Sequence, residues 1–207
     1  MRSTLSKTEI ANMAAAEVGD GVITNIDTDT SPVAQKARLF WNQARDEILE
    51  LHDWNSARAR AELTQDTTAP ENEYDYRYAV PADCIKVRRV IASESSFQEP
   101  TWEADQDFIV TNASAIEIVY TKREEVTTLY SPLLVKAIAI NLAAYLAISV
   151  ANDAKLQAQL LARRGLVIRE AEKTDSRERN KDEDPYGGSE WEDVGRQGLS
   201  TTRSPIR

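Results

Sequence analysis

The sequence predicts an α+β protein, mainly α-helical, in which a bundle of about four helices carries a small antiparallel β-sheet. Apolar residues recur with the period of a helix before residue 55 and after residue 130, but alternate with a period of two between residues 58 and 120. Residues 174–207 are charged and glycine-rich, too poor in apolar side chains to build a core. We therefore expect a domain over residues 1–173, a β insertion at about 58–120, and an extended C-terminal arm over 174–207.

The first two helices have clear start signals. Ser6 is followed three residues later by Glu9, the spacing of a capping box, and Gly19 closes the apolar pattern that follows. The Ser-Pro pair at 31–32 predicts the second start, because proline at the first helical position loses no hydrogen bond. The apolar face of this second helix predicts that it runs to about Trp54.

The middle of the chain has the period of strands. In YDYRY, residues 74–78, tyrosines alternate with charged residues, as on a half-buried strand. Further short candidates are residues 85–90, 108–111 and 116–120, separated by polar or proline-containing turns. These segments predict one small antiparallel sheet inserted between helices.

The last two helices are predicted from the Ser-Pro pair at 131–132 and from Asn152 and Asp153, which are suited to capping a helix start. The run from residue 133 to 151 is nearly long enough to span a membrane. Lys136 and Asn141 interrupt it, and no basic flank orients it. We therefore expect a buried helix of the bundle rather than a membrane span.

The composition limits the possible functions. A net charge of −9 argues against a dedicated nucleic-acid or anionic-membrane binder, although an acidic wall that DNA passes without sticking is compatible with it. With one cysteine, Cys84, and one histidine, His52, the chain forms no internal disulfide and no Cys/His zinc site. His52 ends a helical pattern, where we expect it to satisfy nearby carbonyl groups rather than act in catalysis. No metal, cofactor or catalytic residue is predicted.

The acidic loop with Asp20, Asp27 and Asp29 suggests a calcium site, but it lacks the glycine and the distal glutamate of a calcium-binding loop. Turn-forming side chains are the simpler interpretation. Two other functions stay open: a tail-associated cell-wall hydrolase that uses a carboxylate of this loop, which requires two carboxylates facing each other across a cleft, and a soluble regulatory binding protein.

The C-terminal arm contains aromatic residues that disorder alone does not require. Its central stretch, DEDPYGGSEWEDVGR over residues 182–196, carries Trp191 without periodic apolar neighbours. Tryptophan and tyrosine often dominate the binding energy of interfaces. We expect this stretch to bind a partner through Asp184, Pro185, Tyr186, Gly187, Gly188, Trp191 and Arg196.

Several residue patterns occur in a characteristic order. The stretch AAAEVGDGVITNIDTDTSPVAQKA, residues 14–37, comes first, and YDYRYAVPADCIKVRRV, residues 74–90, comes last. Between them lie Arg45, Asp46, Leu49, Trp54, Ala57 and Leu63. This order resembles the head-to-tail adaptor proteins of short-tailed bacteriophages, the family that includes the tail tubular protein A. Ser56 departs from the pattern, which has an aromatic residue in this segment.

The resemblance covers residues 9–90 well and residues 116–172 more loosely. It implies a structural virion protein at the capsid–tail junction, assembled in the host cytoplasm as a ring of about twelve copies. The implied partners are the portal protein, the tail nozzle protein, further copies of the chain, and DNA that passes without sequence-specific binding. No membrane partner is implied, and the arm is expected to order against the portal and neighbouring adaptors.

Overall fold

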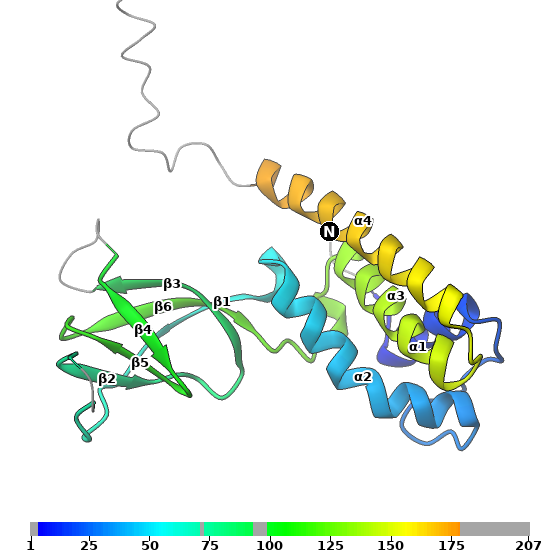
Figure 1. The fold of residues 1–207 in the computed structure, drawn as a ribbon, viewed down its shortest axis with the longest axis horizontal. Coiled ribbons are helices and arrows are strands. Elements are labelled where there is room, and N and C mark those ends of the chain that lie inside the picture. The colour runs from blue at the N-terminus through cyan, green and yellow to red at the C-terminus, as the bar shows by residue number, and fades with distance from the viewer. Residues whose placement is uncertain (1–3, 71–72, 93–98, 179–207) are drawn as a thin grey trace, which may run out of the picture. The chain divides into compact units, whose positions relative to one another are not determined.

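The structure, a computed structural model, describes residues 4–70, 73–92 and 99–178 (Figure 1). These residues form four α-helices and two antiparallel sheets, each of three strands, so the predicted α+β class is confirmed. The helices are α1 (Lys7–Glu17), α2 (Pro32–Leu51), α3 (Pro132–Ser149) and α4 (Ala154–Glu178). The strands are β1 (Arg58–Glu62), β2 (Tyr76–Ala79), β3 (Cys84–Ala92), β4 (Trp102–Asp105), β5 (Phe108–Thr111) and β6 (Ile116–Lys122).

The predicted helix starts are confirmed. Ser6 caps α1 in a reciprocal box, in which its hydroxyl accepts from the Glu9 amide at 3.3 Å and the Glu9 carboxylate accepts from the Ser6 amide at 2.7 Å. Ser31 and Ser131 are the N-cap residues of α2 and α3, each followed by proline. After α1, Gly19 has a φ of +73°, a left-handed conformation that glycine adopts without strain.

The second helix ends earlier than predicted. α2 stops at Leu51, and Trp54 lies beyond it in an extended turn. The indole of Trp54 folds back and donates to the carbonyl of Ile48 at 2.7 Å, while its ring is 1% exposed. A side chain therefore satisfies one of the carbonyls that the helix end leaves free, which apolar periodicity alone does not reveal.

α3 lies at the centre of the helical part of the molecule. It packs against α1 and α2, and α4 adds Leu160, Val167 and Ala171 to the same apolar core. By length and composition α3 meets the criterion for a membrane span, but 67% of that stretch is buried inside the protein, and core helices pass the same test. The prediction of a buried helix for this segment is confirmed.

The strands form two sheets rather than the single sheet predicted. The first sheet has the order β1-β6-β3, and the second has the order β2-β5-β4. Tyr78 and Ile109 of the second sheet share a core with Val90, Ile118 and Tyr120 of the first. Alternation along each strand predicts which face is buried but not which strand is its neighbour, so the division into two sheets could not be predicted from it.

β3 connects the sheets to the helices because its pairing with β6 is interrupted twice, between Cys84 and Lys86 and again between Val87 and Arg89. Such bulges re-aim side chains. Ile85 packs against the helical core, whereas Val87 packs into the core between the sheets. Arg88 donates to the carbonyl of Trp54 and to the hydroxyl of Thr121, both at 2.8 Å.

Candidate functional site

The residues predicted to bind a partner lie outside the described part of the chain. They are Asp184, Pro185, Tyr186, Gly187, Gly188, Trp191 and Arg196. The predicted start of the arm at residue 174 falls within α4, which continues to Glu178. The sites described below therefore belong to the described residues.

An apolar cleft of about 380 Å³ lies among α1, α3 and α4. Leu5 and Met13 line it from the N-terminal side, and Val135 and Ile140 line it from α3. Met13 is 39% exposed, although it lies on a helix whose neighbouring apolar residues are buried. The cleft is therefore an apolar surface that the described residues leave partly open to solvent.

Two cationic side chains border this cleft, one of them held in an ion pair and the other unpaired within the described residues. One terminal nitrogen of Arg163 of α4 donates to both carboxylate oxygens of Glu17 of α1, each at 2.8 Å. Lys136 is the single charged residue of α3 and is half-buried. Within the described part of the chain, its ammonium makes no hydrogen bond or ion pair. An unpaired cation beside apolar walls favours an external carboxylate as partner.

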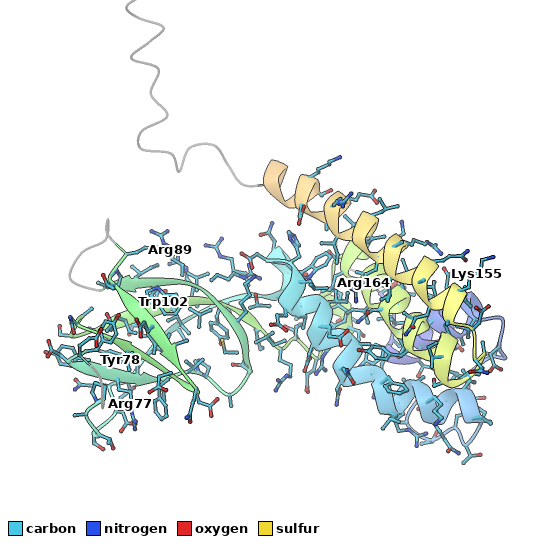
Figure 2. All side chains as sticks on the ribbon, in the orientation of Figure 1. Arg77, Tyr78, Arg89, Trp102, Lys155 and Arg164 are labelled. Atoms are coloured by element: carbon cyan, nitrogen blue, oxygen red, sulfur yellow. The ribbon has the colours of Figure 1, made fainter. Side chains whose placement is uncertain are left out.

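A polar network, separate from the apolar cleft, crosses the helical core. Asn141 of α3, 1% exposed, donates to the Ala44 carbonyl and to the Glu47 carboxylate, both at 2.9 Å. Its own amide oxygen accepts at 2.7 Å from Arg164 of α4, the residue labelled in Figure 2. The Tyr145 hydroxyl also donates to Glu47, so α2 and α3 meet at this carboxylate and α4 joins them through Asn141.

The network determines the charge state of its members. Burial by itself raises the pKa of Glu47, but hydrogen bonds from Asn141, Tyr145 and Gln43 outweigh it and hold that pKa below its ordinary value. Burial, together with the hydrogen bond to Glu47, raises the pKa of Tyr145 to about 12. The carboxylate is therefore ionised and the phenol neutral at neutral pH, a structural arrangement with no group poised to exchange a proton.

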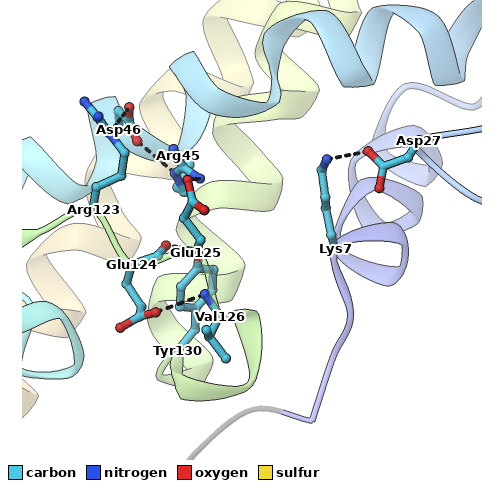
Figure 3. Close-up of polar contacts among 9 residues, drawn as sticks. All are labelled: Lys7, Asp27, Arg45, Asp46, Arg123, Glu124, Glu125, Val126 and Tyr130. Carbon is cyan, nitrogen blue, oxygen red and sulfur yellow. Dashed lines mark hydrogen bonds and ion pairs between the residues drawn. The ribbon is translucent and has the colours of Figure 1, made fainter. Parts of the chain in front are cut away.

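A second polar cluster lies where the chain leaves β6 for α3 (Figure 3). Arg45 of α2, 4% exposed, pairs with Asp46 at 2.8 Å and approaches Glu125 at 3.8 Å. Arg123 donates to the other carboxylate oxygen of Asp46 at 3.0 Å. Asp46 therefore bridges two arginines and attaches the segment after β6 to α2.

The same segment is held by Glu124. Its side chain is buried and accepts from the Val126 amide at 3.0 Å, and its carbonyl accepts from the buried Tyr130 hydroxyl at 2.6 Å. Burial raises the pKa of Tyr130 well above its ordinary value, so the phenol acts as a permanent donor. A polar groove of about 480 Å³ next to this segment is lined by Asp83, Lys122 and Glu125, among others. These contacts shape a turn and show no catalytic pairing.

The acidic loop is used to build its own turns. Asp29 accepts from the amides of Ser31 at 2.8 Å and Thr24 at 2.9 Å, and these hydrogen bonds lower its pKa. Asp27 pairs with Lys7 at 2.6 Å. A lowered pKa is the opposite of what a general acid needs. Among residues 4–70, 73–92 and 99–178, no group of three or more His, Cys, Asp or Glu side chains is placed to hold a metal ion.

The single histidine caps a helix end, and the single cysteine is half-buried at the start of a strand. His52 is the C-cap residue of α2, as its helix-end position predicted, and its ring lies edge-on to Trp54 with centroids 4.9 Å apart. Burial raises the pKa of the half-buried Cys84 thiol to about 11, so the reactive thiolate is rare at neutral pH.

In the sequence, Lys136 and Asn141 stand out only as interruptions of an apolar run. In the structure Asn141 is the centre of the polar network and Lys136 is the unpaired cation at the cleft. The available signal was their isolation, because a single polar residue in an apolar helix needs either a partner or a route to solvent. The sequence does not identify that partner.

No protein-family model matches the chain, and a search of curated proteins finds no match.

Proposed function

We propose that the chain is a structural virion protein, the head-to-tail adaptor that joins the portal to the tail nozzle and lines part of the DNA channel. It would assemble in the host cytoplasm as a ring of about twelve copies. Its partners would be the portal protein, the nozzle protein and neighbouring copies, with DNA passing without sequence-specific binding. No enzymatic activity and no cofactor are part of this proposal.

The observation that carries the proposal is the order of the adaptor-like patterns along the chain. Residues 14–37 cover the end of α1, the acidic loop and the start of α2. The pattern from Arg45 to Leu63 covers the second half of α2 and β1, and residues 74–90 cover β2 and most of β3. Three unrelated segments thus resemble the same family in the same order.

Two further features support a scaffold role. We propose that the four helices act as one bundle, with α3 at its centre, which would present the sheets on one side of a rigid unit. The net charge of −9 suits a channel wall that DNA passes, since like charge suppresses contacts with phosphate. The hydrolase alternative has less support, because Asp27 and Asp29 of the loop proposed for it are occupied by local contacts.

The decisive experiment measures whether the chain adds to the portal ring. Mass photometry of the full-length chain mixed with its proposed portal partner should show a multi-copy increment on the portal ring. The Tyr186→Ser/Trp191→Ser double variant should lose most of that increment, because it removes both aromatic anchors of the arm.

A truncation after Glu178 is the matched control for the arm, since it keeps α4 whole, whereas a cut at Lys173 removes part of that helix. Circular dichroism of each variant checks that the helices are intact. A full-length chain that leaves the portal mass unchanged at every ratio would overturn the adaptor proposal. Portal binding that survives in both arm variants would keep the adaptor and reject the arm as its dock.

A further inference from the structure

We infer that the apolar cleft among α1, α3 and α4 binds residues 182–193 of a second copy of this chain, an inference that rests on the proposed ring. The cleft, lined by Leu5, Met13 and Lys136 among others, would be the acceptor, and the arm of the neighbouring copy would be the ligand. One arm and one cleft per copy make a head-to-tail contact, the type that closes into a ring.

The cleft has two features that select its ligand. Its apolar walls, from residues such as Val135 and Ile140, offer burial to an aromatic or aliphatic side chain. Lys136 places a half-buried ammonium, unpaired within the described residues, on the same wall. Arg163 adds a cation that is already held by Glu17 at 2.8 Å. The ligand that fits is an apolar group flanked by carboxylates.

The segment from 182 to 193 has this composition. It contains six acidic residues and no basic residue, and Trp191 lies directly between Glu190 and Glu192. The indole supplies a large apolar surface, and the flanking carboxylates supply the missing partner of Lys136. Charge complementarity therefore pairs this segment, rather than the basic terminus that follows it, with the cleft.

The length of the chain beyond α4 permits the contact. Trp191 lies thirteen residues beyond Glu178, the last residue of α4. An extended chain of that length spans up to about 45 Å, comparable to the diameter of about 40 Å expected for a domain of this size. The arm of one copy is thus long enough to reach a cleft on an adjacent copy.

The test uses the full-length chain carrying Trp191→Ala, so that its own arm does not compete, and a fluorescent synthetic peptide of residues 182–196. Fluorescence anisotropy should show saturable binding. Lys136→Glu should weaken the peptide's affinity by about tenfold or more, because it replaces attraction by repulsion in an apolar setting. Lys155→Glu is the matched control, the same charge change at an exposed position at the start of α4, and should leave the affinity within about twofold.

A charge exchange makes the assignment specific. A peptide carrying Glu190→Lys and Glu192→Lys should fail to bind the Trp191→Ala chain but should bind the chain that also carries Lys136→Glu. If circular dichroism shows that Lys136→Glu is misfolded, Met13→Glu provides a second variant, at the half-exposed wall of the cleft. Met13→Glu should also abolish binding.

Equal affinity for the Lys136→Glu and parent chains, equal losses for Lys136→Glu and Lys155→Glu, or no binding at all would each overturn the cleft assignment. Portal addition is measured separately by mass photometry, so the two proposals fail separately. If the chain adds to the portal but its cleft does not bind the peptide, the adaptor proposal stands and the cleft proposal is rejected. If the cleft binds the peptide but the chain never adds to the portal, the cleft proposal stands and the adaptor proposal is rejected.

Discussion

The helices and the sheets of this protein differ in how their buried polar groups obtain hydrogen-bond partners. The helical core surrounds Asn141 and Glu47 with donors from three helices, so that a buried amide and an ionised carboxylate are satisfied together. The cluster between the sheets is built from apolar and aromatic side chains, and Tyr78 directs its hydroxyl out of it to the Ala113 carbonyl at 2.8 Å. Thr111 of β5 is 0% exposed and donates to the nearby Thr101 carbonyl at 2.8 Å. Buried polar groups are therefore satisfied by a network in the helices and by single local contacts in the sheets.

The two regions also differ in how they are connected. Within the helical part, α3 packs against α1 and α2, and apolar residues of α4 join the same core. The sheets reach the helices through few contacts, chiefly Ile85 and Arg88 of the bulged strand β3 and the Asp46 bridge to Arg123. The junction therefore depends on polar contacts of single side chains, and the following predictions test this difference.

The largest effect is expected in the helical core. Ile138→Ala should lower the free energy of unfolding by about 2–5 kcal/mol, because Ile138 is 0% exposed and the cavity has little room to collapse. Ile148→Ala, on the same helix but 41% exposed, should change it by less than about 0.5 kcal/mol. Urea unfolding followed by circular dichroism measures both, and equal losses would contradict the assignment of α3 as the core helix.

The next effect is expected at the junction. Arg88→Met keeps the aliphatic stem but removes two 2.8 Å hydrogen bonds, and should cost about 1.5–3 kcal/mol. Urea unfolding followed by tryptophan fluorescence and by far-ultraviolet circular dichroism should then give two different midpoints. Different midpoints would show that the sheets and the helices no longer unfold together. Arg60→Met removes only an exposed ion pair to Glu117 at 3.5 Å and should have little effect.

A smaller effect concerns acid stability. Because the folded state holds the pKa of Glu47 below the ordinary value of 4.5, this residue adds stability above that value. The contribution is lost as the pH falls through the lower folded pKa. Glu47→Gln should flatten the loss of stability below about pH 4.5, measured by urea unfolding at several pH values. An unchanged slope, or an equal change for the exposed Glu50→Gln, would reject Glu47 as the acid-sensitive group of α2.

The smallest effect concerns reactivity rather than stability. With a pKa of about 11, Cys84 should react only slowly with a disulfide reagent at pH 8. The rate should be lower than that of an ordinary thiol by roughly two orders of magnitude, because the thiolate is the nucleophile. The rate should rise to the ordinary value in urea. Fast modification of the native protein would show that the strand end at Cys84 is more open than the structure indicates.

The sequence predicted the helices better than the strands. Ser6, Ser31 and Ser131 begin helices as expected, because caps and the helical period are local properties of the chain. β5 and the centres of β2, β3 and β6 lie in the predicted strand segments. β1 and β4 were not identified, since RARAE and WEAD lack the run of β-branched residues that marks a strand.

The candidate site was predicted less completely. The arm with Tyr186 and Trp191 was proposed from composition, and it lies outside the described residues, so it stays a prediction. The cleft was not predicted, because Met13, Lys136 and Arg163 come from three separate helices. No periodic pattern within one segment indicates which side chains of distant segments will lie around the same opening.

Helix starts, apolar helix faces and the accumulation of charge could be predicted from the sequence, because caps, period and composition act over a few residues. Tertiary packing established that the strands form two sheets and that bulges in β3 direct Ile85 and Arg88 toward the helices. It also established that Asn141 has partners, whereas Lys136 has none among the described residues. Those outcomes depend on contacts between residues far apart in the chain, whose pairing is chosen by packing and by the cost of leaving polar groups unsatisfied.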